Sequence, residues 1–434
     1  MERRYSLRCY LAGAVAARAG DEMSGPALML AGFTLAGSTT EASSLLAGIT
    51  ISAAVGGPVL GAILDRAGRP GRLLAVALVL YAAGLGTILV GLGRLPFAVT
   101  ILIAVVTGLL GPALSGGWTA QLPRVVTGDG LPRANTLDSM TFSAASLAGP
   151  ALAGGMAEVL GAPTAVVVSA GLIGLALPAA WMLPARPGRG RRLRTTSVTS
   201  DLAAGIRVII RKPPLARATL TSVVSCAAQG MLTACIALLG ERVLGGAGRG
   251  AMLLSCAATS ALMANAVLAR FPRLVAPDTV IWVSALVQAA ALALAAPGQP
   301  ALLIVAVVMV GIGEGPQLAA LFAVRHREAP EHLRGQIFTT GASLKITGFA
   351  LGASAAGPVA TWSLPSALAL AASVAVLAAL AFFVIPSAAR PGLLTERSAP
   401  AASGRVTDRA AAEAASRACP ADQGRTGPSS AGCP

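Results

Sequence analysis

The chain has 434 residues, of which 55% are hydrophobic and only 12% are charged, and its mean hydropathy is +0.74. This composition excludes an ordinary soluble domain and leaves room for about a dozen bilayer-crossing helices of ~20 residues each. The formal net charge of +15 does not indicate nucleic-acid binding, because the basic residues lie in short loops between apolar runs and aromatic residues make up only 4% of the chain.

Apolar runs separated by turn signals predict an all-α integral membrane protein with twelve transmembrane helices. The first run follows three arginines, but Asp21 and Glu22 interrupt it, so we interpret it as an uncleaved membrane helix and not as a signal peptide. Turn signals such as Gly-Ala-Pro at 161–163 separate the runs. The expected spans are 9–36, 43–64, 73–93, 97–121, 137–159, 163–184, 215–240, 250–269, 276–296, 300–323, 337–358 and 364–386.

The distribution of Lys and Arg predicts the orientation of these helices. If the N-terminus is cytoplasmic, the inner segments carry 22 basic residues and the outer loops carry three, Arg94, Arg242 and Arg249. Basic residues near membrane helices are retained on the cytoplasmic side. We therefore expect a multi-pass protein of the cell (cytoplasmic) membrane with both termini cytoplasmic.

Three charged residues lie inside the first span. Arg18 precedes Asp21 and Glu22 by three and four residues, so all three share one side of the helix and can pair. A charge inside the bilayer costs ~2.5–3.5 kcal/mol on insertion scales, so each one needs a reason. Either the three form a neutralised cluster that lets the helix insert, or one carboxylate faces a central cavity and exchanges a proton or meets a cationic substrate.

A polar turn, Gly61–Arg72, separates the second and third spans. Its glycines permit a sharp backbone, and its arginines favour the cytoplasmic surface. Five of its residues fit the pattern G-x-x-x-D-R-x-G-R-[RK]: Gly61, Asp65, Arg66, Gly68 and Arg69. Pro70 replaces the second basic residue of the pattern, and Arg72 supplies that charge. The turn thus resembles the signature loop between helices 2 and 3 of the major facilitator superfamily (MFS) of secondary transporters; the alternative is an ordinary basic loop.

The fifth span contains a cluster of small residues. Gly149, Pro150, Gly154 and Gly155 resemble the G-P-x-x-G-G segment of drug:proton antiporters in the same superfamily, with one extra residue before the final pair. Small residues also let helices approach closely, so the alternative is simple close packing. The extra residue leaves the direction of transport open.

An internal repeat divides the chain into two halves. Adding 201 to the positions of four arginines in the first half gives four arginines in the second: Arg270, Arg273, Arg325 and Arg334. Two six-helix halves related by a parallel repeat are the architecture of the superfamily. We expect an N-terminal bundle at 1–184, a cytoplasmic linker at 185–214 that contains a short surface helix from Asp201 to Arg211, a C-terminal bundle at 215–386 and a disordered cytoplasmic tail at 387–434.

Glu314 lies in the tenth span and has no basic neighbour one turn away, which suits reversible protonation. The glycines around it and Pro316 indicate either a locally broken helix or a carboxyl held by a partner between helices. Gln317, one turn later, can hydrogen-bond a substrate or the backbone. Lys345 is the only lysine inside a span; it either extends to the cytoplasmic surface or pairs with Glu314 or an acid of the first helix.

Other classes of function lack a signal. The chain contains no phosphate-binding G-x-x-x-x-G-K-[ST] loop, no cofactor motif and no nucleophile–base cluster, so we expect neither an ATP-driven pump nor an enzyme. The cysteines show no metal-ligand spacing. His326 and His332 lie near Glu328 and Glu331 in a loop before the eleventh span, which we interpret as a solvated loop and not as a metal site.

The resemblance implies a secondary transporter of the drug-efflux-like bacterial branch, in which two bundles rock about a shared site. The expected function is proton-coupled export of a small organic compound by a monomer in the lipid bilayer, without cofactor, metal or nucleic acid. Asp65, Arg66 and Arg69 would then latch the bundles together on the cytoplasmic side. Uptake, passive facilitation, and a membrane sensor or scaffold that retained the fold without transport remain alternatives.

Overall fold

The structure is a computed structural model of the full chain, and residues 6–36, 39–185, 198–245 and 248–386 are described. All of them belong to one compact unit. The predicted tail at 387–434 and residues 186–197 of the predicted linker lie outside the described residues. The other part of that linker contains the expected helix, which runs from Val198 to Arg211.

The described residues form helices and no strands. The first half contains α1 (Leu7–Ala36), α2 (Thr39–Arg66), α3 (Pro70–Gly91), α4 (Phe97–Gly108), a π-helical turn (Ala113–Gly117), α5 (Leu131–Leu160), α6 (Ala162–Leu175) and α7 (Leu177–Trp181). The second half contains α8 (Val198–Arg211), α9 (Pro213–Leu244), α10 (Gly248–Arg270), α11 (Pro277–Ala295), α12 (Pro300–Glu328), α13 (Arg334–Trp362) and α14 (Leu364–Val384).

Proline marks the start of many of these helices. A proline in the first turn has no N–H group to leave unsatisfied, and its fixed φ angle already suits a helix. The turn signals in the sequence therefore become helix starts. The prolines at these positions are Pro70, Pro132, Pro163, Pro213, Pro277, Pro300 and Pro365.

The predicted membrane architecture is confirmed. Within the described ranges, nine helical segments have the length and apolar composition needed to cross a bilayer. The other three long helices, α1, α5 and α13, complete the twelve expected spans. They are less apolar because they carry polar side chains such as Arg18, Asp138 and Gln336, which are buried between helices.

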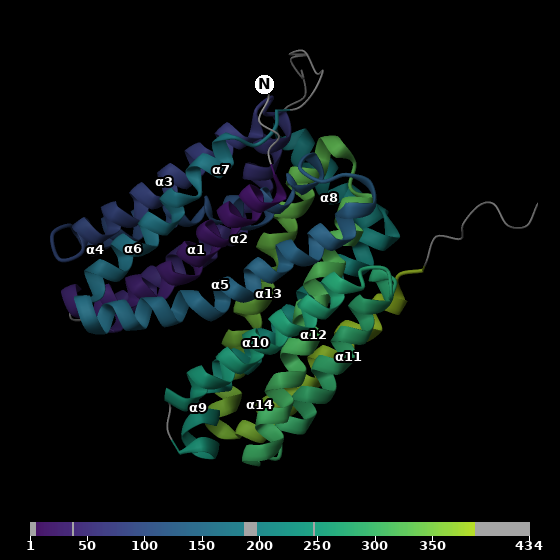
Figure 1. The fold of residues 1–434 in the computed structure, drawn as a ribbon. Coiled ribbons are helices and arrows are strands. Elements are labelled where there is room, and N and C mark those ends of the chain that lie inside the picture. The colour runs from purple at the N-terminus through teal and green to yellow at the C-terminus, as the bar shows by residue number, and fades with distance from the viewer. Residues whose placement is uncertain (1–5, 37–38, 186–197, 246–247, 387–434) are drawn as a thin grey trace, which may run out of the picture. The chain divides into compact units, whose positions relative to one another are not determined.

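Each half of the chain has its own apolar core. Tyr10, Leu78 and Trp118 belong to the core of the first half, whereas Leu292 and Val307 belong to that of the second. Figure 1 shows α1 to α6 side by side in one group and α9 to α14 in another. The two groups correspond to the two predicted six-helix bundles.

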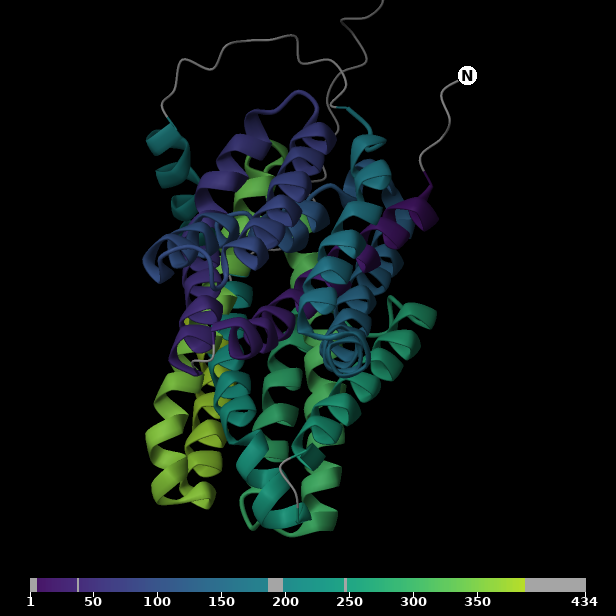
Figure 2. The ribbon, with the colours of Figure 1, turned by 90° about the vertical axis from the view of Figure 1, so that its left-hand side faces the viewer.

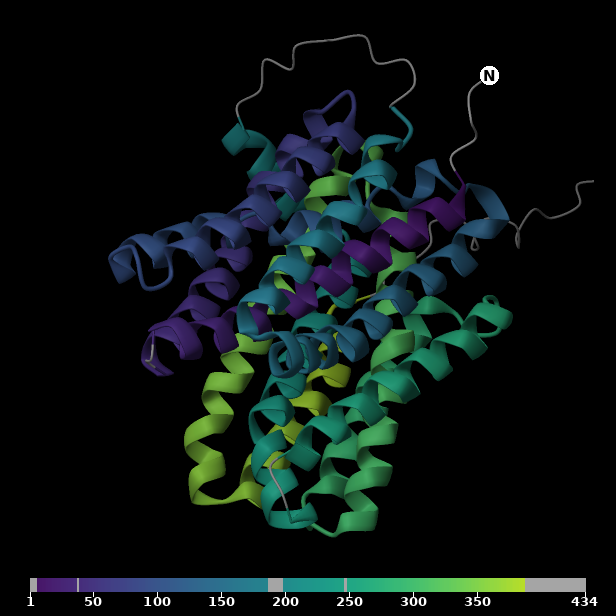
Figure 3. The ribbon, with the colours of Figure 1, turned by 60° about the vertical axis from the view of Figure 1, so that its left-hand side comes forward.

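The halves meet along α2 and α13, where small residues let the helices approach closely. A side chain at Gly57 would collide with Thr339 and Ser343, and one at Gly61 with Gln336 and Thr339. The α8 helix lies at the same end as the turn between α2 and α3, which we name the loop end (Figures 2 and 3). Its Leu202 carbonyl accepts a 3.0 Å hydrogen bond from the Gln336 side chain of α13.

Two local expectations are corrected. The α12 helix continues through Gly311, Gly313, Gly315 and Pro316, so the broken-helix interpretation of this stretch is wrong. In α5, a methyl group at Gly154 or Gly155 would meet nothing within 4 Å, and both residues are exposed, so these two glycines do not form a helix contact. Only the first glycine of that cluster, Gly149, is close to another helix.

Gly149 allows α5 to cross α1. A Cβ atom at this position would lie 2.6 Å from Glu22 Cβ and 2.9 Å from the Met23 nitrogen. We expect Gly149→Ala to destabilise the protein by ~1–3 kcal/mol, because backbone atoms cannot move aside cheaply. Gly154→Ala, the matched control on the same helix, should be neutral or slightly stabilising. Thermal unfolding of the detergent-purified proteins checks this; equal stabilities of the two variants would contradict the close approach.

Candidate transport site

A cavity of ≈ 380 Å³ lies between the two halves of the chain. Asp21 and Glu22 of α1 and Tyr81 of α3 line it from the first half, and Arg325 of α12 and Lys345 of α13 line it from the second. Apolar side chains form much of the remaining wall. Ligand sites in proteins combine such a mainly apolar wall with a few placed polar groups. The cavity is therefore the candidate site for a small molecule.

The structure places both predicted acids of α1 at this cavity. The Tyr81 hydroxyl donates a 2.8 Å hydrogen bond to an Asp21 carboxylate oxygen, and the Ser24 hydroxyl lies 3.3 Å from the Tyr81 oxygen. Glu22 is exposed, and Asp21 and the Glu314 carboxyl of α12 both interact electrostatically with it. Asp21 and Glu22 thus line the cavity, and Glu314 of the opposite half interacts with Glu22 without lining the cavity itself.

The structure favours one of the expected alternatives for each of two residues of the second half. Lys345 lines the cavity and interacts electrostatically with Glu314, as the second alternative for this residue expects. Gln317 is buried in a polar cluster between α9, α11 and α12, where its amide group donates to Ser225 at 3.1 Å and accepts from Gln288 at 3.3 Å. Its amide group also donates to the Ile281 carbonyl at 3.3 Å, so the expected hydrogen bond to the backbone is present, and Gln317 does not line the cavity.

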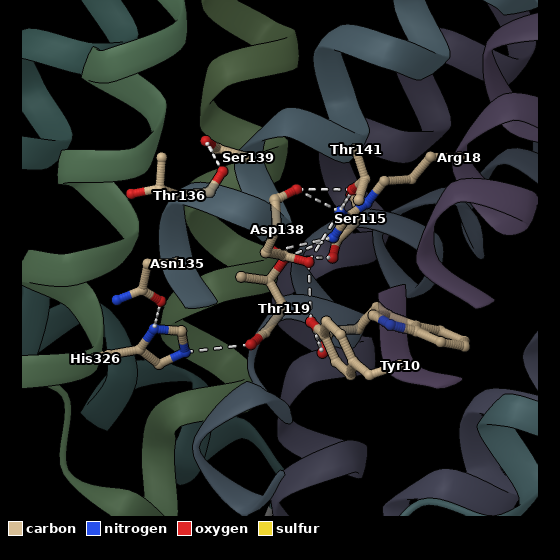
Figure 4. A network of polar contacts seen from close by, with 11 residues as sticks. Tyr10, Arg18, Ser115, Thr119, Asn135, Thr136, Asp138, Ser139, Thr141 and His326 are labelled. Atoms are coloured by element: carbon tan, nitrogen blue, oxygen red, sulfur yellow. Dashed lines mark hydrogen bonds and ion pairs between the residues drawn. The ribbon is translucent and has the colours of Figure 1, made fainter. Parts of the chain in front are cut away.

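Arg18 does not make its ion pair with the acids of its own helix. Its guanidinium lies 3.0 Å from a carboxylate oxygen of Asp138 on α5, and both side chains are almost fully buried. Figure 4 shows Arg18, Tyr10 and Thr119 converging on Asp138. The Thr119 and Tyr10 hydroxyls donate to the two oxygens of that carboxylate at 2.8 and 3.1 Å. Because Asp138 compensates the charge of Arg18, this arginine ties α1 to α5 while the acids of α1 line the cavity.

His326 is buried at the junction of the two halves, and its expected place in a solvated loop is wrong. It lies in the last turn of α12, and its ring points towards α5 (Figure 4). Nδ1 is 2.7 Å from the Asn135 side-chain oxygen, and Nε2 is 3.2 Å from the Thr119 carbonyl oxygen. Both partners belong to the first half, so His326 helps to hold the halves together near the loop end.

Asp65 makes a second contact between the halves at the loop end. Its carboxylate oxygens accept hydrogen bonds from the backbone N–H groups of Gly335 and Gln336, at 2.9 and 2.8 Å. These N–H groups belong to the first turn of α13, where an α-helix has unsatisfied donors and a partial positive charge. Asp65 therefore caps a helix of the opposite half. Of the other motif residues, Arg69 and Gly68 are exposed.

The cavity begins where these loop-end contacts stop. On α13, Gln336 bonds to Asp65, whereas Phe338 lines the cavity. On α12, His326 bonds to the first half, whereas its neighbour Arg325 lines the cavity. On α2, the Ala53 carbonyl accepts a 2.7 Å hydrogen bond from Ser343 of α13. The arrangement is a cavity whose floor is closed on the loop-end side.

The sequence model of the Major Facilitator Superfamily matches residues 10–339. The chain belongs to this superfamily. An uncharacterized MFS-type transporter, y4rN from Sinorhizobium fredii (strain NBRC 101917 / NGR234), is 28% identical over 376 residues, which cover 80% of this chain and 88% of that protein.

Solved MFS structures share the fold at lower identity. The human organic anion transporter MFSD10 (TETRAN) is 15% identical and gives a TM-score of 0.72, with 88% of this chain and 99% of that chain covered. The proton:xylose symporter XylE bound to 6-bromo-6-deoxy-D-glucose is 13% identical and gives a TM-score of 0.69, with 89% and 97% covered. These likenesses confirm the twelve-helix MFS fold.

The roles of three polar residues in this MFS chain were missed in the sequence: Asp138 inside the first bundle, and Asn135 and His326 at the contact between the bundles. Asp138 and Asn135 lie in a polar run before an apolar one, which is typical of a loop end. For Asp138 no signal was present, because Asp21 and Glu22 already offer Arg18 two acids on its own helix. For His326 the signal was absent, because the arginines on either side of it are typical of a surface turn.

Proposed function

We propose that this MFS chain is a secondary active transporter that exports a small organic compound in exchange for protons. The observation that carries the proposal is a group of carboxyls from both halves: Asp21 and Glu22 line the cavity, and Glu314 interacts electrostatically with Glu22 and with Lys345, which also lines it. Ionisable groups inside a membrane are costly and mark substrate or proton pathways. A carboxyl that is neutral on one side of the membrane and charged on the other couples a proton to the movement of the substrate.

The substrate would move by alternating access, in which the cavity opens to one side of the membrane and then to the other. In the conformation described, the contacts of Asp65 with α13 and of His326 with Asn135 close the cavity floor at the loop end. We propose that the loop end is cytoplasmic, as the excess of basic residues there favours. Breaking these contacts would open the cavity to the cytoplasm, so we propose that Asp65 acts as a latch. We also propose that the protein operates as a monomer in the cell membrane.

Proton-coupled uptake is the second candidate. It is favoured by the fold likeness to XylE, which is named as a proton:xylose symporter. The three acids serve either direction equally well. Import would require the compound and the proton to move together, whereas export requires them to move in opposite directions.

Vesicles of known orientation distinguish these functions. In inverted vesicles with an acidic lumen, an exporter should release protons when a compound from a panel of cationic, neutral and anionic molecules is added outside. An importer should instead acidify right-side-out vesicles when the same compound is added. Facilitation without protons, or a sensor without transport, should give no proton signal in either preparation, and that result would refute proton coupling.

The acids at the cavity should be required for the proton signal. We expect Glu22→Gln and Glu314→Gln each to reduce compound-driven proton release by roughly tenfold or more, because an amide cannot exchange a proton. Glu158→Gln is the matched control, since Glu158 is exposed near the end of α5 and does not line the cavity. A pH-sensitive dye in inverted vesicles measures the effect. Full proton release in both the Glu22→Gln and the Glu314→Gln variants would show that these carboxyls are structural.

A further inference from the structure

Arg325 is a buried cation at the floor of the cavity. Its side chain is 2% exposed, yet it contributes to the cavity wall. Neither Nε nor Nη2 of its guanidinium has a hydrogen-bond partner among the described residues. Buried guanidinium groups are normally paired, because an uncompensated charge away from water is strongly unfavourable. An arginine with two unsatisfied nitrogens that faces a ligand-sized cavity can therefore take a partner from outside the chain.

The other cations near the cavity already have acidic partners. Arg18 pairs with Asp138 at 3.0 Å, and Lys345 interacts with Glu314. Among the described residues, no ion pair joins Arg325 to a carboxylate. The acids Asp21 and Glu22 line the same cavity. Arg325 is thus a cation available to an anion from outside.

The guanidinium is held in place by its neighbours. Its central carbon lies 5.7 Å from the centre of the Phe338 ring. On α13, Gly341 has no side chain, and a Cβ atom there would collide with the Arg325 guanidinium. The glycine thus leaves the space that the arginine occupies. A positioned planar guanidinium binds a carboxylate or a similar oxyanion through two parallel hydrogen bonds.

Apart from Asp21, Glu22, Lys345 and a few hydroxyl groups, the wall is mainly apolar and aromatic. It contains Phe142 from the first half and Leu318, Phe322, Phe338, Ile346 and Phe349 from the second. Such a wall favours a ligand with an apolar body next to its charged group.

We propose that the cavity binds a small organic anion, whose oxyanion group is held by Arg325 and whose apolar body packs against the aromatic wall. This inference rests on the proposed transport function and names the class of its substrate. In transport, the substrate would neutralise Arg325, while the acids of α1 and α12 carry the proton. Because Arg325 adjoins His326, the anion would bind directly above the contacts that close the loop end.

A binding assay without any proton gradient tests this inference separately from the proposed function. The probes are three carboxylates, butyrate, 4-phenylbutyrate and 2-naphthoate, each compared with its own amide and amine. Within each series the apolar body stays the same, and the charge is negative, zero or positive. The readout is protection of Cys226, which lines the cavity, from N-ethylmaleimide in full-length protein whose other five cysteines are serine. At least one of the carboxylates should protect Cys226, and it should do so far better than its amide or amine.

Four variants locate the anion. Arg325→Met should weaken protection by the carboxylate by about 10- to 100-fold, which corresponds to the loss of hydrogen bonds to a charged group. Arg325→Lys should be intermediate, because it keeps the charge without the planar fork. Gly341→Ala, which displaces the guanidinium without changing the charge, should also weaken protection. Gly357→Ala on the same helix, where a methyl group meets nothing within 4 Å, should not.

Several results would overturn the proposal: protection by none of the carboxylates, equal protection by an amide or amine, or undiminished carboxylate protection in folded Arg325→Met and Gly341→Ala. The last result would make Arg325 a gate residue and not an anion site. Protection by an anion without proton release in vesicles would refute the proposed proton coupling and leave the anion site intact. Proton release driven only by amines would refute the anion site and leave the proposed proton coupling intact.

Discussion

Asp138→Asn is expected to destabilise the protein by about 3–5 kcal/mol. The substitution leaves Arg18 as an uncompensated charge in a site where it is 2% exposed and the carboxylate is fully buried. It also removes the acceptor that Thr119 and Tyr10 share, since an amide offers one oxygen in place of two. Thermal unfolding and size-exclusion chromatography of the detergent-purified protein measure the loss.

The control is the removal of both charges together. Replacing a buried ion pair by apolar side chains of similar size is often neutral or stabilising, whereas breaking it is costly. The double variant Arg18→Met, Asp138→Leu should therefore recover most of the stability that Asp138→Asn loses, and it should retain transport. If the double variant folds but does not transport, the pair takes part in function. If Asp138→Asn is as stable as the original protein, the buried pair is not a structural requirement.

The fold was largely predictable because its elements are marked locally. Each span is a long apolar run, and prolines at positions such as Pro70, Pro277 and Pro300 mark the helix starts. A bilayer leaves no alternative to a helix for such a run, since every backbone polar group must be satisfied within the segment. The existence and order of the membrane-spanning helices were therefore predicted correctly, because the local composition decides them.

The candidate site was only partly predictable. The acids of the first span were expected at a cavity, but Arg325 and His326 depend on where a helix ends and which way it faces. The tenth span was predicted to end at residue 323, but α12 continues to Glu328. The five extra residues bring Arg325 to the cavity and His326 to the contact with α5. The charges in this turn lowered its hydropathy, although they are buried against the other half. A boundary error of little more than one turn therefore concealed two important side chains.

Pairing across the sequence was the second obstacle. Arg18 and Asp138 are 120 residues apart, and a pattern within one helix cannot show a partner on another. The spacing of Arg18, Asp21 and Glu22 indicated a local cluster, which the helix geometry permits. The packing of α1 against α5 decides otherwise, and it gives the arginine a more buried partner. Asp21 and Glu22 are left for the cavity for this reason.

The second large effect concerns Asp65, the centre of the loop motif. Its carboxylate accepts two backbone hydrogen bonds at the start of α13, so it stabilises the conformation that is closed at the loop end. An asparagine can accept only one of them and carries no charge to complement the helix terminus. Hydrogen bonds to charged groups contribute ~1.5–3 kcal/mol each. We therefore expect Asp65→Asn to shift the balance between closed and open states by about 10- to 100-fold and to reduce transport without preventing membrane insertion.

Labelling of Cys226 separates a change of conformation from a loss of folding. In a variant with Cys226 as the only cysteine, a membrane-impermeant maleimide applied from the loop-end side should react slowly, because the contacts of Asp65 and His326 lie between that side and the cavity. Asp65→Asn should react roughly tenfold faster or more. Arg69→Gln is the matched control, since Arg69 belongs to the same motif but is exposed. If the two variants label and transport alike, the motif does not act through the carboxylate. If only Asp65→Asn opens the loop end, one side chain that caps a helix of the opposite bundle accounts for the closure, and the arginines of the motif serve the orientation of the chain in the membrane.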